Sequence, residues 1–401
     1  MDFINWHGHT DASNHNNRDS IIKTNQMIDI ALELGHSGVG ITDHAVLSNH
    51  VKAILHLKEK RKEINKMLEV TPNSEILQDK KRKLDNFKLG LGCELYVVNR
   101  DEVNGLREDN KYIKFYHLVV LPKDFIGYRQ LAKLSTIGWE NSFYYRGLER
   151  TPVYKEDLRR IVEENKGHLI VTSACLGSEF ATYVIEYLDS LYMKLTDRAE
   201  YCYRRIVEYI KFMKELFEDD FYIELQPNHG EQQIQYNQFA LKIAKYYNIK
   251  AIISTDAHYH RPNTVGTHSI FLKAQNAERE TESFYSSTYM MPVEEIREYC
   301  KYISDEDFEW IIGNTIEIGN KIEEIDLYKP TQVPDATIEF DKNHKGFFHT
   351  IKDVEILYPY IHKYVTSEYM IDKIILQQIE KGMKNLNQDC NKVNLERINK
   401  E

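Results

Sequence analysis

Proline and cysteine are both scarce in this sequence. The chain holds 9 prolines in 401 residues, and this scarcity argues against long extended linkers and disordered segments. Its 5 cysteines are scattered and none forms a C-x-x-C pair. We therefore expect no disulfide framework, and a reducing compartment fits this pattern.

Long apolar runs are also missing. No run approaches the roughly 20 residues that a membrane span requires. The opening residues, MDFINWHGH, lack the basic segment followed by an apolar one that marks a secretory signal. We therefore expect a cytoplasmic protein that has no membrane partner.

Positive charge is in short supply. Lysine and arginine total 52 against 62 acidic residues, which gives a formal net charge of −10. The surface as a whole therefore does not attract nucleic acid. A nucleic-acid substrate would need local basic patches or bound metal ions to offset the repulsion.

Short apolar runs rich in β-branched residues recur along the first 260 residues and alternate with stretches of helical periodicity. The clearest helical stretches lie at 25–35, 155–167 and 236–248. This alternation is typical of an α/β protein with a parallel sheet, either open or closed into a barrel. The seven expected strands lie within residues 3–9, 38–44, 89–98, 116–122, 168–175, 221–229 and 250–258.

Two regions depart from this alternation. Residues 50–88 are highly charged, and their helical spacing breaks at Thr71-Pro72-Asn73, which predicts a helical hairpin inserted between two strands. The hairpin is basic enough for a nucleic-acid contact, but interspersed acidic residues favour a solvated helix surface. Beyond residue 285 the alternation fades. We expect a first domain over 1–285 and a smaller, mostly α-helical module over 286–401.

Residues that can bind metal ions or transfer protons gather where the predicted strands end. In an α/β barrel the carboxyl ends of the strands form one edge, and active sites lie there. His117 is the exception, because it opens its strand. The strand-end residues are His7, His9, Asp43, His44, Cys175, His229, Asp256 and His258, with Glu94 inside its strand.

The spacing of these residues indicates a metal site. His7-x-His9 and Asp256-x-His258 each direct two side chains to one face of a strand, because side chains alternate with a period of two. Histidine, carboxylate and one thiolate suit zinc, manganese or iron better than magnesium or calcium. Nine candidate ligands exceed the needs of one ion, so we expect two or three. Closely spaced ions can clamp a phosphoryl group during its displacement.

Each residue also has an ordinary structural explanation. A lone His7 would more often be a partly buried core histidine, but His9 and the Asp256-x-His258 pair argue against that here. Cys175 by itself is more often a small buried apolar residue. We expect Asp43 to support a neighbouring ligand rather than bind metal. His15 and Asp19 compete for one ligand position, and the sequence leaves that choice open.

Seven segments in this order resemble the polymerase and histidinol phosphatase (PHP) domain, and most closely the N-terminal region of the bacterial DNA polymerase III alpha subunit. The likeness runs over most of residues 3–335, and the family fold is a distorted (β/α)7 barrel. The segments are ELGHSGVGITDH, GCELYVV, YHLVVLPKD, ENSFYYRGL, SACLGSE, FYIELQPNHGEQ and STDAHY.

The resemblance implies a trinuclear metal centre. It places His7, His9, Glu94 and Asp256 around one ion, and it has Glu94 bridge to a second ion held by His117 and Cys175. It gives Asp19, His44 and His258 to a third ion. Glu94, Asp256 and His9 would be central to catalysis. Every ligand position carries a competent residue, which favours activity, and intact sites in the family accompany phosphoester hydrolysis, including 3′→5′ exonuclease proofreading.

The resemblance also implies a polymerase context. Residues 286–401 resemble the start of the polymerase palm region, but the clustered aspartates of a palm are not evident. SDEDFEW (304–310) offers Asp305 and Asp307, yet Ser304 followed by acidic residues is typical of a helix cap. We expect a free-standing nuclease, or one part of a split polymerase with a polymerase or replisome partner.

Candidate substrate contacts follow from nearness in sequence to the ligands. We expect DNA as the substrate, with a single-stranded 3′ end at the site. Tyr144 and Tyr145 are candidates for stacking on terminal bases, although core packing is an equal explanation. The candidate substrate-binding residues are Arg18, Arg146, His229 and Arg261, with Lys123 as a further phosphate contact.

Three other functions remain open from the sequence. One is a small-molecule phosphomonoesterase, against which the polymerase-like segments argue. Another is a non-catalytic module in which metal ions hold the fold and the helical parts bind a polymerase partner. The third is an amidohydrolase, which also opens with His-x-His. Asp256-x-His258 and Cys175 count against this last possibility.

Overall fold

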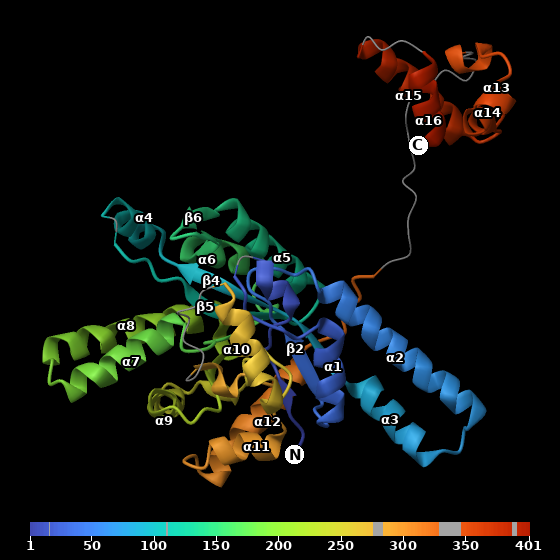
Figure 1. Ribbon diagram of the computed structural model, residues 1–401. Helices are drawn as coiled ribbons and strands as arrows, with labels where there is room; N and C mark the ends of the chain where they lie inside the picture. The colour runs from blue at the N-terminus through green and yellow to red at the C-terminus, as the bar shows by residue number, and fades with distance from the viewer. Residues whose placement is uncertain (16, 110, 276–283, 329–345, 387–390) are drawn as a thin grey trace. The chain divides into compact units, whose positions relative to one another are not determined.

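The computed structural model describes residues 1–15, 17–109, 111–275, 284–328, 346–386 and 391–401 (Figure 1). The chain divides into two compact units, Met1–Tyr328 and Lys329–Glu401. All strands among the described residues belong to the first unit. None of the helices in the described residues combines the length and apolar character that crossing a membrane requires.

The strands of the first unit form two main sheets and a small hairpin. The first sheet is parallel, in the order β1 (Ile4–Asn5), β2 (Gly38–Ile41), β3 (Lys88–Leu91). β6 (Phe143–Tyr145) and β7 (Leu148–Arg150) pair as the antiparallel hairpin. The six-stranded sheet has the order β11 (Lys250–Ile253), β10 (Phe221–Leu225), β9 (Leu169–Thr172), β5 (Tyr116–Pro122), β4 (Cys93–Val98), β8 (Pro152–Tyr154).

The mixed α/β class is confirmed, but the closed seven-stranded barrel is not. The described residues form no closed sheet, and the two sheets touch through isolated bridges at Gly8–Ala257 and His44–Glu94. The expected strand 89–98 is two strands, because Gly92 interrupts it. A Cβ at Gly92 would lie 2.6 Å from a Leu121 methyl group and 2.8 Å from the Val120 carbonyl, so this position requires glycine.

One strand also runs against the expected direction. β5 pairs antiparallel with both of its neighbours, β4 and β9. The start of β5 therefore lies at the same edge as the end of β9. This reversal resolves the anomaly of His117, which opens its strand and yet lies beside residues that follow other strands.

The helices cover the sheets and supply most of the core. The three helices expected at 25–35, 155–167 and 236–248 are present as α1 (Thr24–Glu33), α6 (Lys155–Glu164) and α9 (Glu231–Tyr246). α7 and α8 run side by side as a long hairpin and bury Phe180, Ile206 and Tyr209 against the six-stranded sheet (Figure 1). The hairpin helices are α7 (Glu179–Tyr192) and α8 (Thr196–Phe217), and further helices of the first unit are α4 (Arg100–Glu108), α5 (Phe125–Glu140) and α10 (Val265–Lys273).

The helical hairpin expected at about 50–88 is present as α2 (His50–Val70) and α3 (Glu75–Asn86). The side chain of Ser74 caps α3 by accepting a hydrogen bond from the Leu77 amide. Many of its cations have acidic partners: Lys81 pairs with Asp85 at 2.7 Å, and Arg82 pairs with Asp79 at 2.6 Å. These pairs agree with a solvated helix surface.

The second domain begins later in the structure than the sequence suggested. We expected a division after residue 285, but α11 (Val293–Tyr299) and α12 (Asp305–Lys321) belong to the first unit. The Trp6 indole donates to the Thr315 carbonyl at 2.8 Å, which fixes α12 to the end of β1. The cap at Ser304 is confirmed, because its side chain accepts from the Asp307 amide. The fading alternation therefore marked a change of composition within one compact unit.

The second unit is helical in the residues that the structure describes. Its helices are α13 (Val354–Leu357), α14 (Pro359–Val365), α15 (Met370–Asn385) and α16 (Lys392–Lys400). Phe348, Tyr358, Ile361, Leu376 and Leu395 form their shared core. The helical character expected for this part of the chain is thus present, over a shorter range than 286–401.

Candidate metal centre

The candidate ligands converge at one edge of the two sheets. His7 and His9 follow β1 and are fully buried, and Asp256 follows β11 and is 1% exposed. The Gly8–Ala257 bridge holds these two segments side by side. Asp256 has a left-handed backbone with φ of 49°, which a non-glycine residue adopts only where its surroundings impose it.

His7, His9 and Asp256 form the first group. The two imidazole Nε2 atoms lie 3.1 Å apart, and the Asp256 Oδ1 atom lies 3.2 Å from His7 Nε2 and 3.1 Å from His9 Nε2. Donors held around one ion at about 2.1 Å are separated by roughly 3.0–3.4 Å, so these spacings fit a shared ion. Burial by itself lowers the pKa of His7, but Asp256, Glu224 and Glu94 together raise it well above its ordinary value. The carboxylates therefore favour positive charge at this point, which a divalent ion could supply.

A buried carboxylate that sequence reasoning missed orients the His7 ring through a hydrogen bond at Nδ1. Glu224 on β10 is fully buried, and its Oε1 atom lies 2.7 Å from His7 Nδ1. Thr172 donates to the other oxygen of Glu224 at 2.5 Å, and Gln226 donates to Oε1 at 3.1 Å. The carboxylate accepts the Nδ1 proton, so His7 Nε2 presents its lone pair to the ion. The signal was a glutamate in the middle of an apolar strand, where burial requires a partner.

His9 is oriented by a second chain of hydrogen bonds. Its Nδ1 atom lies 3.0 Å from Ser13 Oγ, and Ser13 donates its only proton to Asp43 Oδ1 at 2.8 Å. His9 must therefore donate from Nδ1, which leaves Nε2 as a ligand. Burial lowers the pKa of His9 to about 4, with the nearby His44 and His258 adding to the effect, so this ring is neutral at pH 7. Asp43 lies where a supporting residue should, bonded to Ser13 and Thr10.

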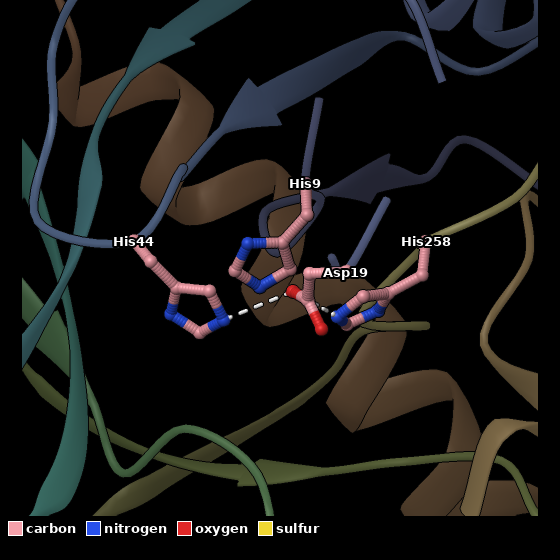
Figure 2. A group of neighbouring side chains, drawn as sticks. All are labelled: His9, Asp19, His44 and His258. Atoms are coloured by element: carbon pink, nitrogen blue, oxygen red, sulfur yellow. Dashed lines mark ion pairs between the residues drawn. The ribbon is translucent and has the colours of Figure 1, made fainter. Parts of the chain in front are cut away.

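Asp19, His44, His258 and His9 form the second group (Figure 2). The Asp19 Oδ2 atom lies 3.1 Å from His44 Nε2 and 3.0 Å from His258 Nε2. His258 donates from Nδ1 to the Asp256 carbonyl at 2.6 Å, so its Nε2 lone pair faces Asp19. Asp19 lies inside the cluster. His15 lies at the pocket wall, where its Nδ1 atom donates to the Ala12 carbonyl at 3.2 Å.

Glu94 connects every group. Its Oε1 atom lies 3.4 Å from His7 Nε2 and 2.9 Å from His117 Nδ1, and its Oε2 atom lies 3.4 Å from His9 Nε2 and 2.9 Å from His44 Nδ1. Burial by itself raises the pKa of Glu94, but the surrounding histidines, His117 first, hold it well below its ordinary value. The carboxylate is thus ionised and can bridge between ions.

His44, Glu94 and His117 form the third group, and Cys175 lies beside His117. Its Sγ atom lies 3.4 Å from His117 Nδ1 and accepts from the Gly177 amide at 3.3 Å. Burial, followed by Glu94 and Asp256, raises the pKa of the Cys175 thiol well above its ordinary value. This sulfur therefore becomes a thiolate only beside a cation, which is how cysteine binds metal ions. The donors of all three groups fit divalent ions.

The groups open onto a pocket of about 320 Å³. Its walls include two cations that the sequence analysis missed, Lys114 and Arg150, and the aromatic residues Tyr96, Tyr112 and Tyr285. No sequence motif marks Lys114 or Arg150. Lys114 precedes β5 and Arg150 lies in the β6–β7 hairpin, and these positions were the only hint that the two residues line the pocket.

The predicted substrate contacts lie elsewhere. The residues lining the pocket do not include Arg18, Arg146, His229 or Arg261 among those the structure describes. Arg261 pairs with Glu33, and Lys123 pairs with Asp220 at 2.7 Å. The His229 ring stacks on Tyr299 at 4.0 Å, and the Arg146 guanidinium lies 5.0 Å from the ring centre of Tyr112. Tyr145 donates to the Lys111 carbonyl at 2.9 Å, which is a packing role.

The curated relatives of this chain are DNA polymerases. The chain is 34% identical over 382 residues to "Probable DNA polymerase YorL" of Bacillus subtilis (strain 168), which covers 94% of this chain and 28% of the relative. It is equally similar to a DNA-directed DNA polymerase of Bacillus phage SPbeta. It is 27% identical over 278 residues to the DNA polymerase III subunit alpha of Aquifex aeolicus (strain VF5), covering 68% of this chain and 20% of that protein. The chain therefore spans less than a third of the length of these relatives.

A sequence model of the PHP domain matches residues 5–228, which is more than half of the chain. The matched range contains His7, His9, Asp19, His44, Glu94, His117, Cys175 and Glu224, so it holds most of the clustered side chains. On this match, and with the likeness to DNA polymerase III alpha subunits, the chain belongs to the PHP domain family.

Proposed function

We propose that this chain is a metal-dependent phosphodiesterase that removes nucleotides from the 3′ end of single-stranded DNA. The reaction is hydrolysis: water adds to the terminal phosphorus, the bond from phosphorus to the 3′ oxygen of the preceding nucleotide breaks, and a nucleoside 5′-monophosphate leaves. The preceding nucleotide keeps a 3′ hydroxyl group and becomes the new end.

The observation that carries the proposal is the position of Glu94. Its two oxygens lie within 3.4 Å of nitrogen atoms from four different histidines. One carboxylate at the centre of three donor groups fits a cluster of two or three ions sharing a ligand, and such clusters suit phosphoryl transfer. Zinc, manganese and iron fit this mixture of nitrogen, oxygen and sulfur donors.

The residues divide into holding and orienting roles. His7, His9, Glu94 and Asp256 would hold one ion; Glu94, His117 and Cys175 a second; and Asp19, His44 and His258 a third. Bound ions would polarise the phosphoryl oxygens and lower the pKa of water near the phosphorus. Glu224 and the Ser13–Asp43 pair fix the direction of His7 and His9, so the donors do not have to reorganise when substrate arrives.

The choice of DNA as the substrate, and of a replication protein as the partner, comes from the relatives. All those described above are named as DNA polymerases. A role beside a polymerase or another replication protein follows from that likeness, and a 3′ end is the end that a polymerase extends.

The test uses 3′-labelled and 5′-labelled single-stranded DNA with added manganese or zinc, and p-nitrophenyl phosphate as a generic phosphomonoester. We compare wild type with Asp256→Asn and Glu94→Gln, with Asp79→Asn on the surface of α3 as the matched control. We expect stepwise shortening from the 3′ end that Asp79→Asn retains and both site variants lose. Phosphate release from the monoester alone would replace this proposal with a phosphomonoesterase. No turnover of either substrate by the folded, metal-loaded protein would indicate a structural module.

A further inference from the structure

Two cationic side chains in the pocket form no ion pair with any residue that the structure describes. Lys114 and Arg150 line the same pocket as Glu94, Asp19 and Asp256. Among the described residues neither side chain forms an ion pair or a hydrogen bond, and the Arg150 Nε atom is buried without a partner. Lys155, by contrast, has an acidic partner, because Glu179 lies 2.7 Å from its ammonium group. A half-buried guanidinium without a partner is costly unless a ligand supplies one.

The fold holds these two cations at fixed points. The segment before β5 is fastened to the β6–β7 hairpin, because the Tyr145 hydroxyl accepts from the Ile113 amide at 3.2 Å and donates to the Lys111 carbonyl at 2.9 Å. The Phe115 ring, next to Lys114, lies 5.1 Å from the Arg150 guanidinium. The hairpin and the segment therefore place Lys114 and Arg150 on one wall.

This wall lies beside the candidate ligands. Lys114 is three residues from His117. Partial burial lowers the pKa of its ammonium group, while Glu186, followed by Cys175, acts to raise it. Tyr96 lines the pocket with Arg150, and its ring stacks on His44 at a centroid distance of 5.5 Å. A phosphate at the cluster would thus have a second anion-binding position beside it.

We propose that Lys114 and Arg150 form a subsite for a second phosphate, next to the one that is hydrolysed, so that the site selects a phosphodiester chain over a small ester with one phosphate. This inference rests on the proposed function. Arg150 offers a planar fork that can hold two phosphate oxygens, and Lys114 offers a compact positive charge on the same wall. The aromatic residues Tyr112 and Tyr285 on the same pocket can face the bases between the two phosphates.

The test compares a substrate with several phosphates and a substrate with one. Single-stranded DNA of ten nucleotides carries neighbouring phosphates, and bis(p-nitrophenyl) phosphate carries one. We measure kcat and KM on both for Lys114→Met, Arg150→Met and the double variant. The matched control is Arg129→Met, because Arg129 is exposed on α5 and is not among the residues lining the pocket. We also measure binding of the fluorescein-labelled ten-nucleotide strand by anisotropy as a function of salt.

We expect KM for the ten-nucleotide strand to rise about tenfold for each single variant, because each removes one charge-assisted phosphate contact. Turnover of the single-phosphate diester should change less than twofold. The slope of log affinity against log salt should fall by about 0.7 per cation removed, which is the value for single strands. Arg129→Met should match wild type in every measurement.

Each failure has a distinct meaning. If wild type shortens DNA and the Lys114 and Arg150 variants do so equally well, the subsite is wrong and the proposed function stands. Equal losses on both substrates would also overturn the subsite, because the cations would then act on the hydrolysed phosphate or on the fold. If wild type binds the strand through Lys114 and Arg150 but hydrolyses neither substrate, the subsite stands and the proposed function fails. Absence of binding by wild type would overturn the subsite as well.

Discussion

Glu224 offers a sharp test of how the buried surroundings control the metal centre. It lies on β10, is not among the described residues that line the pocket, and has its Oε1 atom 2.7 Å from His7 Nδ1. In Glu224→Gln the side chain keeps its shape and loses its charge, so the Nδ1 proton of His7 is held by a neutral amide oxygen or faces an amide N–H. Hydrogen bonds to charged groups contribute about 1.5–3 kcal/mol, and loss of such a supporting partner weakens metal affinity by about 10- to 100-fold.

The assay is a competition between the metal-stripped protein and a chelating dye, titrated with zinc and with manganese. We expect the dissociation constant of the most weakly bound ion to be about 10- to 100-fold higher in Glu224→Gln than in wild type. Glu317→Gln is the matched control. Glu317 lies on α12, where it pairs with Lys250 at 2.6 Å, and it is not one of the clustered residues. If a folded Glu224→Gln protein binds metal with unchanged affinity, His7 is not a metal ligand that Glu224 orients through its Nδ1 proton.

Three further predictions concern stability. Chelation with EDTA should lower the midpoint of thermal unfolding, since an ion present at 100 times its dissociation constant stabilises the fold by about 2.7 kcal/mol; an identical midpoint in differential scanning fluorimetry would contradict metal binding. Gly92→Ala should destabilise the fold by about 1–3 kcal/mol in urea through overpacking, whereas Gly105→Ala, where a Cβ meets nothing within 4 Å, should not destabilise it; equal effects would mean that the close approach at Gly92 is not limiting. Burial lowers the pKa of His36 to about 4, below its value in the unfolded chain. As pH falls, His36 therefore binds a proton in the unfolded chain before it does so in the folded chain. This difference should lower the free energy of unfolding by about 2 kcal/mol between pH 7.5 and pH 5. His36→Gln should lose that part of the pH dependence in urea unfolding, and an unchanged pH profile would argue that His36 is accessible to water.

The convergence of the candidate ligands could be predicted because it follows from strand periodicity. His7, His9, Asp256 and His258 are spaced by two at the ends of apolar runs, and the structure brings all four into one cluster. His117 was an exception to this pattern, and its role as a ligand rested on the family resemblance. Its place at the start of a strand becomes understandable once β5 is seen to run antiparallel.

Other features depend on contacts that no local pattern encodes. The split of residues 89–98 at Gly92 reflects the close approach of Val120 and Leu121, which are distant in sequence. α12 joins the first unit through Trp6 and Thr315, whose hydrogen bond spans 309 residues. Arg18 and Arg261 were chosen for their nearness in sequence to ligands, but a neighbour on a loop can point away. Lys114 and Arg150 reach the pocket because two separate segments pack together around Tyr145.

The most direct test of the central claim is to strip the protein of metal and titrate manganese back while following the release of nucleoside monophosphate from 3′-labelled single-stranded DNA. The account predicts no release without metal and a rise that saturates at two or three ions per chain, with no saturable rise in Asp256→Asn. Release that is indifferent to metal, or two to three bound ions with no release from the 3′ end, would contradict it.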